Sequence, residues 1–205
     1  MPTGQPPYVV GISGASGAIL AQRAVERLLA LGHSVHLTAS HTAHDIWLQE
    51  TGLRLEDDVA RWAERGDLRY HRSGDFNAPI ASGSFPTRGM LVIPCSTSTV
   101  GALASGLSTN LLQRAADCAI KEGRRLVVVP RETPLSAIHL ENLLRLAKLG
   151  VFVVPPVPAF YTHPTTVDDI VDQIVGRALS VLGVPEGLDE RFIWTGRSPR
   201  PGVDT

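Results

Sequence analysis

Uninterrupted apolar runs alternate along this chain with segments whose apolar residues recur every three or four positions. Fully apolar runs are typical of strands whose sheet is covered on both faces, whereas the longer spacing is typical of helices. Strands are predicted at Tyr8–Ile12, Val35–Ala39, Gly89–Ile93, Leu126–Val129 and Val151–Val154. Helices are predicted at Gly17–Leu31, Thr42–Glu50, Leu55–Arg65, Ser98–Gly123 (which Gly106 could interrupt), Ser136–Leu149 and Val167–Leu182.

The regular alternation of strand and helix predicts an α/β fold. We expect a three-layer Rossmann-like (flavodoxin-like) parallel sheet with helices on both faces. The length of 205 residues suits a single α/β domain with a core at about 8–184 and disordered tails at 1–7 and 197–205. Residues 67–88 are rich in Gly, Ser and Pro, which predicts irregular structure there. In such a fold, ligands bind at the carboxyl ends of the strands.

Composition excludes several classes of function. The chain has 19 Lys and Arg residues against 20 Asp and Glu, which argues against nucleic-acid binding as its main role. Two cysteines cannot build a disulfide framework. No apolar run reaches the roughly 18 residues of a membrane span, and no signal-peptide pattern opens the chain. We therefore expect a cytoplasmic protein that binds neither nucleic acid nor membrane.

A glycine-rich segment, Gly11–Gly17, joins the first predicted strand to the first helix. Glycines allow the backbone to approach a ligand closely, and a helix amino terminus attracts anions. The spacing matches neither the dinucleotide fingerprint nor a Walker loop. The simpler interpretation is a tight turn in which Ser16 caps the helix.

Four hydroxyl residues, Ser96–Thr99, follow the strand that ends near Pro94. They could donate hydrogen bonds to a phosphate, or one of them could simply cap the next helix. Cys95 has no histidine near it in sequence, so a covalent role is disfavoured. Cys118 falls inside a helix, where packing is the natural role.

Charged residues supply further candidates. Arg131 and Glu132 directly follow a strand, on the ligand side of the sheet, and arginine binds phosphate with two parallel hydrogen bonds. Arg114, Asp117 and Lys121 share one helix face, which is more often a solvated face than a site. Spacing places no third ligand beside the neighbouring His41 and His44, so a metal site is disfavoured.

The last predicted helix carries an apolar stripe with Arg177 at its edge. A half-buried arginine in that position would require an anionic partner, unless its stem merely lies along the core with its head in water. Before this helix, the rigid proline-rich segment Pro155–Tyr161 ends in two aromatic residues.

Taken together, these segments resemble the UbiX/Pad-type flavin prenyltransferases. The resemblance rests on G-I-S-G-A-S-G-A, H-x-A-x-D-x-x-x-x-E-T, A-S-G-S-F, P-C-S-T-S-T, N-L-L-x-R-A-A-D-x-A-x-K-E, V-P-R-E-T-P-L, H-L-E-N-L-L-R-L, P-P-V-P-A-F-Y and D-D-I-V-D-Q-I-V-G-R, and it covers about Val9–Val184. It implies transfer of a dimethylallyl group to reduced FMN without a metal. It also implies a homododecamer with active sites between subunits, whose prenylated FMN serves UbiD-type decarboxylases.

The resemblance also implies residue roles. FMN would be held by Gly14, Ala15, Ser16, Ser40, Ser96, Thr97, Ser98, Thr99 and Arg131. The donor phosphate would be bound by Arg114, Lys121, Tyr161 and Arg177. Catalysis would fall to Ser16, Glu50, Lys121 and Glu132, with the two glutamates handling protons. His41 stands where many members have lysine, and the match of Trp194 to a family position is loose.

Two other functions remain open from the sequence. One is a flavoprotein like the FMN-dependent cysteine decarboxylases, although their P-A-S-A-N-T loop is replaced here by P-C-S-T-S-T. The other is a non-catalytic FMN-binding subunit of an aromatic acid decarboxylase. The sequence also leaves open whether the donor is dimethylallyl monophosphate or diphosphate, and which decarboxylase receives the product.

Overall fold

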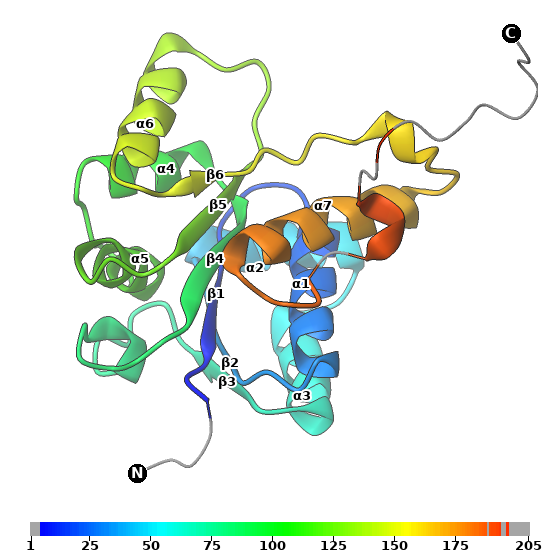
Figure 1. Ribbon diagram of the computed structural model, residues 1–205. Coiled ribbons are helices and arrows are strands. Elements are labelled where there is room, and N and C mark those ends of the chain that lie inside the picture. The colour runs from blue at the N-terminus through cyan, green and yellow to red at the C-terminus, as the bar shows by residue number, and fades with distance from the viewer. Residues whose placement is uncertain (1–4, 188, 194–195, 197–205) are drawn as a thin grey trace, which may run out of the picture.

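The computed structural model describes residues 5–187, 189–193 and 196, which form a parallel sheet between two layers of helices (Figure 1). Its strands are β1 Tyr8–Ile12, β2 Val35–Ala39, β3 Leu68–His71, β4 Gly89–Cys95, β5 Leu126–Pro130 and β6 Phe152–Val153. The α-helices are α1 Ala18–Ala30, α2 His41–Thr51, α3 Leu55–Arg65, α4 Thr97–Ala104, α5 Leu111–Lys121, α6 Ala137–Lys148 and α7 Val167–Leu182. Short 3₁₀ turns lie at Pro79–Ala81, Phe160–Thr162 and Glu190–Phe192.

The strand order β3-β2-β1-β4-β5-β6 confirms the predicted fold class. Because β1 pairs with β2 on one side and with β4 on the other, the order reverses between β1 and β4. Ligands of open α/β sheets bind in the crevice at such a reversal, beyond the carboxyl ends of the strands. The fold therefore directs attention to the segments that follow β1 and β4.

The prediction of irregular structure throughout residues 67–88 is wrong, because β3 lies at its start and a 3₁₀ turn within it. β3 is an edge strand with partly exposed residues, so it lacks the continuous apolar run that marks the central strands. The long helix predicted at Ser98–Gly123 is divided into α4 and α5. Gly106, with a φ of 70°, lies in the connection, as its position suggested.

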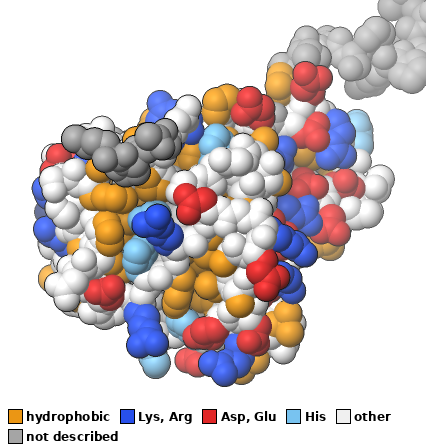
Figure 2. Space-filling view, turned by 90° about the horizontal axis from the view of Figure 1, so that it is seen from below, with side chains coloured by type: hydrophobic (Ala, Val, Ile, Leu, Met, Phe, Trp, Pro, Cys, Tyr) orange, Lys and Arg blue, Asp and Glu red, His pale blue; other side chains and the backbone are white. Residues whose placement is uncertain are grey.

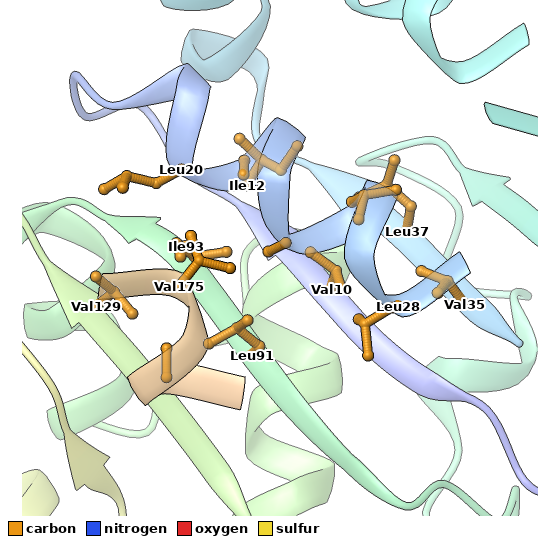
Figure 3. Close-up of a cluster of buried hydrophobic side chains, with 14 of the residues drawn as sticks. Val10, Ile12, Leu20, Leu28, Val35, Leu37, Leu91, Ile93, Val129 and Val175 are labelled. Carbon is orange, nitrogen blue, oxygen red and sulfur yellow. The ribbon is translucent and has the colours of Figure 1, made fainter. Parts of the chain in front are cut away.

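Two apolar cores hold the layers together. Figure 3 shows the core between the sheet and α1 and α7, where Leu20 and Leu28 of α1 and Val175 of α7 lie over the strands. The opposite core joins α4, α5 and α6 to the other face of the sheet, with Leu111 and Leu112 fully buried. These two cores fix the strand ends relative to the helices that begin there.

Charged side chains of both signs are interspersed over the face of the molecule in Figure 2, which agrees with the small net charge. In the part of the chain that the structure describes, no helix is long and apolar enough to cross a membrane.

Candidate active site

The glycine-rich loop after β1 packs directly against the start of α2. A Cβ atom on Gly14 would lie only 2.1 Å from Oγ1 of Thr42, so no larger residue fits there. Gly17 has a φ of 120°, which side-chain-bearing residues rarely adopt. These two glycines allow the loop to turn into α1 while remaining close to α2.

A buried serine ties the loop after β1 to the end of β4. The hydroxyl of Ser13 donates to the carbonyl of Pro94 at 3.0 Å and accepts from the N–H of Ser96 at 2.7 Å. Ser13 is almost fully buried, so these bonds are shielded from water. They hold the two loops on either side of the strand-order reversal in fixed register. Ser13 and Thr42 are not among the site residues predicted from the sequence, since a lone hydroxyl beside glycines carries no distinctive signal.

Glu50, in the last turn of α2, reaches across to the amino terminus of α1. Its Oε2 accepts hydrogen bonds from the N–H of Gly17 at 3.0 Å and from the N–H of Ala18 at 2.7 Å. The carboxylate thus takes the place of a helix cap, and Ser16 does not cap α1 as the simpler interpretation held. A negative charge in this position is also stabilised by the helix dipole.

The environment of Glu50 keeps it ionised. Partial burial alone would raise its pKa, but hydrogen bonds from Ser16 and from the backbone of Ala18 and Gly17 outweigh this effect. The positive charge of Arg131 acts in the same direction, and the pKa of Glu50 lies below its ordinary value. Glu50 is therefore an exposed, ionised base.

Arg131, just beyond β5, completes the link between the strand ends. Its Nε donates to the carbonyl of Ser16 at 3.2 Å, which holds the β5 end against the glycine-rich loop. Its two terminal nitrogens make no hydrogen bond to the described residues and are exposed. They are free to bind an anion with the paired geometry that suits phosphate.

The hydroxyl run after β4 is partly committed to the fold. Ser96 caps α4, since its Oγ accepts from the N–H of Thr99 at 3.2 Å and donates to Oγ1 of the same residue at 3.0 Å. The capping interpretation is therefore correct for Ser96, and Thr97 and Ser98 remain as the hydroxyls without such a role. Burial raises the pKa of the neighbouring Cys95 thiol to about 12, which makes it a poor nucleophile.

Ser40 lies at the start of α2, close to the glycine-rich loop. Its backbone N–H donates to the carbonyl of Ile12 at 2.8 Å, and its hydroxyl lies 3.3 Å from that of Thr42. Ser40 precedes the first residue of α2 but does not cap the helix. The structure thus brings together the Gly14–Ser16 loop, Ser40, Glu50, the Ser96–Thr99 segment and Arg131 at one edge of the sheet.

Arg114 and Lys121 do not join this group within one chain. Both project from α5, where Arg114 pairs with Asp117 at 3.0 Å and Lys121 pairs with Glu122. α5 ends at Lys121 before the chain enters β5, so Lys121 lies near the amino end of the sheet. The five residues of β5 alone rise about 16 Å, which separates Lys121 from the strand ends. Glu132 is exposed just beyond Arg131 and accepts from the N–H of Thr133 at 3.0 Å.

Tyr161 and Arg177 lie on a segment and a helix that touch each other. Figure 1 shows the chain after β6 running out from the body of the molecule to the turn that contains Tyr161. The N–H of Ala159 donates to Oε1 of Gln173 at 3.3 Å, and Arg177 follows Gln173 by one turn on the same side of α7.

The expectation that Arg177 is half-buried is wrong, because it is exposed in the single chain. At the edge of the apolar stripe, its long side chain extends into solvent, as the alternative interpretation allowed. Trp194 lies outside the described residues. Within the described part of the chain, no three His, Cys, Asp or Glu side chains come together as a metal site.

The Flavoprotein family model matches residues 2–179. The flavin prenyltransferase UbiX of Halalkalibacterium halodurans is 45% identical over 190 residues, which cover 90% of this chain and 92% of the relative.

Two solved structures are similar over nearly the whole chain. A dodecameric FMN-dependent UbiX-like decarboxylase from Escherichia coli O157:H7 is 43% identical with a TM-score of 0.84, covering 93% of this chain and 100% of that one. AnUbiX (PadA1), in complex with FMN and dimethylallyl pyrophosphate, is 38% identical with a TM-score of 0.87, covering 95% of this chain and 100% of that one.

Proposed function

This chain belongs to the Flavoprotein family and, within it, to the flavin prenyltransferases, and from that premise we propose that it transfers a dimethylallyl group from dimethylallyl phosphate to reduced FMN. The family resemblance inferred from the sequence motifs is confirmed. The cysteine decarboxylase alternative is not favoured, because relatives that share more than 40% of the sequence carry the prenyltransferase name.

The observation that carries the proposal is the group of strand-end residues around Ser16. Glu50 and Arg131 both bind the backbone of the glycine-rich loop and the start of α1, and Ser13 fixes the adjoining loop after β4. A flavin placed beyond these strand ends would meet a preorganised loop, an exposed arginine fork and unused hydroxyls. We assign FMN to Gly14, Ala15, Ser16, Ser40, Ser96, Thr97, Ser98, Thr99 and Arg131.

The donor phosphate is assigned to Arg114, Lys121, Tyr161 and Arg177. Transfer breaks the allylic carbon–oxygen bond, so negative charge develops on the leaving phosphate and fixed cations stabilise it. Lys121 lies about 16 Å along the sheet from the strand ends of its own chain, so it can act there only in a neighbouring copy. The dodecameric relative supports an assembly that supplies this second copy.

The surface of α6 offers a contact for such an assembly. Only Leu146 of this helix is buried, whereas Ile138, Leu140 and Leu144 are exposed. An apolar surface of this kind is typical of protein–protein contacts. A second copy that covers it would remove these side chains from water.

Two glutamates, Glu50 and Glu132, would handle the protons of the proposed reaction. Glu50, already ionised and beside Ser16, is suited to accept a proton from the flavin as the new ring closes. Glu132, adjacent to Arg131 at the same strand end, is the second glutamate that we assign to proton handling. The prenylated product would be passed to a UbiD-type decarboxylase. We further propose that the whole chain acts as a single flavin-binding domain in the cytoplasm.

A direct assay tests this function. Purified protein is incubated anaerobically with reduced FMN and either dimethylallyl monophosphate or diphosphate, and the flavin is analysed by mass spectrometry. A flavin heavier by one dimethylallyl unit, formed with one donor at catalytic turnover, supports the proposal and identifies the donor. Flavin binding without any mass gain from either donor would instead favour the non-catalytic FMN-binding subunit.

A further inference from the structure

The segment Ala81–Phe85, between β3 and β4, is fastened tightly to α5 and the turn that follows it. The carbonyl of Ala81 accepts from Nε of Arg114 at 3.0 Å and from the thiol of Cys118 at 3.2 Å. Arg124 donates to the carbonyl of Phe85 at 2.7 Å and to that of Gly83. The side chains of Arg114, Cys118 and Arg124 thus hold both ends and the middle of the segment, so its backbone is fixed in place.

Gly83 lies at the centre of this segment, beneath an ion pair. Nζ of Lys121 and Oε1 of Glu122 are 2.5 Å apart, and both lie over Gly83. A Cβ atom on Gly83 would be 2.5 Å from that Nζ and 2.1 Å from that Oε1. Gly83 has no left-handed φ, so its backbone conformation is open to other residues. A side chain at Gly83 would therefore clash with the ion pair and not with the backbone.

We propose that Gly83 is a positioning residue, whose missing side chain lets the Lys121–Glu122 pair rest on the Ala81–Phe85 segment and so fixes the ammonium group that acts on the donor phosphate. The inference rests on the proposed prenyl transfer and on the place of Lys121 in it. Gly83 itself touches neither flavin nor donor in this scheme.

Geometry sets the size of the expected effect. To restore an ordinary contact of about 3.4 Å, a Cβ on Gly83 must push Nζ of Lys121 outward by about 1 Å. The displaced atoms are the far ends of two flexible, exposed side chains, so the fold itself has little to lose. A misplacement of about 1 Å in a catalytic group can cost about 10²-fold in rate.

The test compares Gly83→Ala with Gly74→Ala. Gly74 is the matched control, because a Cβ there would meet nothing within 4 Å and its φ is not left-handed. For Gly83→Ala we expect kcat/KM for the donor to fall about 10- to 100-fold, with FMN affinity, assembly and thermal unfolding unchanged. Gly74→Ala should behave as wild type throughout.

A double-mutant cycle shows whether the effect passes through Lys121. In a Lys121→Ala background, which should itself be impaired, Gly83→Ala should cause no further loss. An equal loss in that background, or a fully active Gly83→Ala enzyme, would overturn the positioning role. So would a Lys121→Ala enzyme with wild-type kcat/KM for the donor.

A second variant keeps the proposal testable if Gly83→Ala proves unstable. Glu122→Ala removes the partner of Lys121 without altering the segment, and it should also lower kcat/KM for the donor while FMN affinity stays unchanged. Wild-type kinetics in that variant would count against the proposal. Failure of the wild-type enzyme to prenylate FMN at all would be a separate result, directed at the proposed function itself.

Discussion

The carboxylate of Glu50 accepts a hydrogen bond of 2.7 Å from the N–H of Ala18, although 32 residues separate the two in sequence. This contact joins the end of α2 to the beginning of α1 at the edge of the sheet where the flavin is placed. A residue that looks like an ordinary surface glutamate in the sequence therefore closes the amino terminus of the first helix. Its position couples the local stability of the glycine-rich loop to the proposed proton transfer.

Replacing Glu50 by Gln should separate these two roles. Gln keeps an oxygen that can accept one N–H, but it loses the negative charge beside the helix amino terminus and cannot take up a proton. We expect turnover to fall by on the order of 10²-fold or more while FMN still binds. Single-turnover mixing of reduced FMN and donor measures the chemical step. Unchanged rates there would return Glu50 to a purely structural role.

Arg131→Ala should weaken FMN binding by about 2–3 kcal/mol, as expected for loss of a charged, two-point phosphate contact. Part of that loss would come from freeing the carbonyl of Ser16, to which Nε of Arg131 donates. Lys at this position keeps the charge but not the paired geometry, and it should recover only part of the affinity. Titration of the apoprotein with FMN gives the values. Wild-type affinity in the Ala variant would remove Arg131 from the flavin site.

The central strands and most helices could be predicted because burial on both faces leaves an unmistakable apolar run or stripe. β3 could not, since none of the residues of the edge strand Leu68–His71 is fully buried. The strand-end position of Arg131 followed from topology alone. The reach of Glu50 to α1 and the bridging by Ser13 depend on tertiary contacts between distant segments, which no local pattern records. The exposure of Arg177 likewise reflects a helix face that a single chain does not cover.

Acid should destabilise the protein through His36, a buried residue of β2. Burial, with the charges of His71 and Arg69, lowers the pKa of His36 from 6.5 to about 4, although Asp67 opposes the shift. His36 therefore stays neutral in the folded protein below about pH 6.5, where the same residue binds a proton in the unfolded chain. Stability should fall as the pH decreases from 6.5 to about 4 and then level off, with a loss on the order of 3 kcal/mol.

The measurement for His36 is urea unfolding at pH 7 and at pH 4.5. His36→Asn does not titrate, yet it can still offer an atom to Nε2 of His71, which lies 3.0 Å from Nδ1 of His36. The variant should be less stable at pH 7 but should lose less stability on acidification. An equal pH dependence in both proteins would mean that other groups control acid sensitivity.

Charging the exposed face of α6 should disrupt assembly. Leu144 is 55% exposed in the single chain, on a helix of which only Leu146 is buried. Leu144→Glu would place a charge where a second copy is expected to cover apolar surface. Analytical ultracentrifugation should show a smaller particle for this variant. Leu144→Met, which keeps an apolar side chain of similar volume, should retain the wild-type mass; an unchanged mass for Leu144→Glu would place the contact elsewhere.

Arg177 and Tyr161 should act on the donor and not on the flavin. Tyr161 belongs to the segment after β6 that contacts α7, and α7 carries Arg177. Arg177→Ala should therefore bind FMN nearly as wild type but lose prenyl transfer, because a fixed cation no longer faces the leaving phosphate. Tyr161→Phe keeps the aromatic ring and removes one hydroxyl, so it should cost less, about 1 kcal/mol in transition-state stabilisation. FMN titration and donor kinetics on the same preparations distinguish the two effects. If both variants lose FMN while remaining folded, these residues belong to the flavin site and the two-pocket arrangement is wrong.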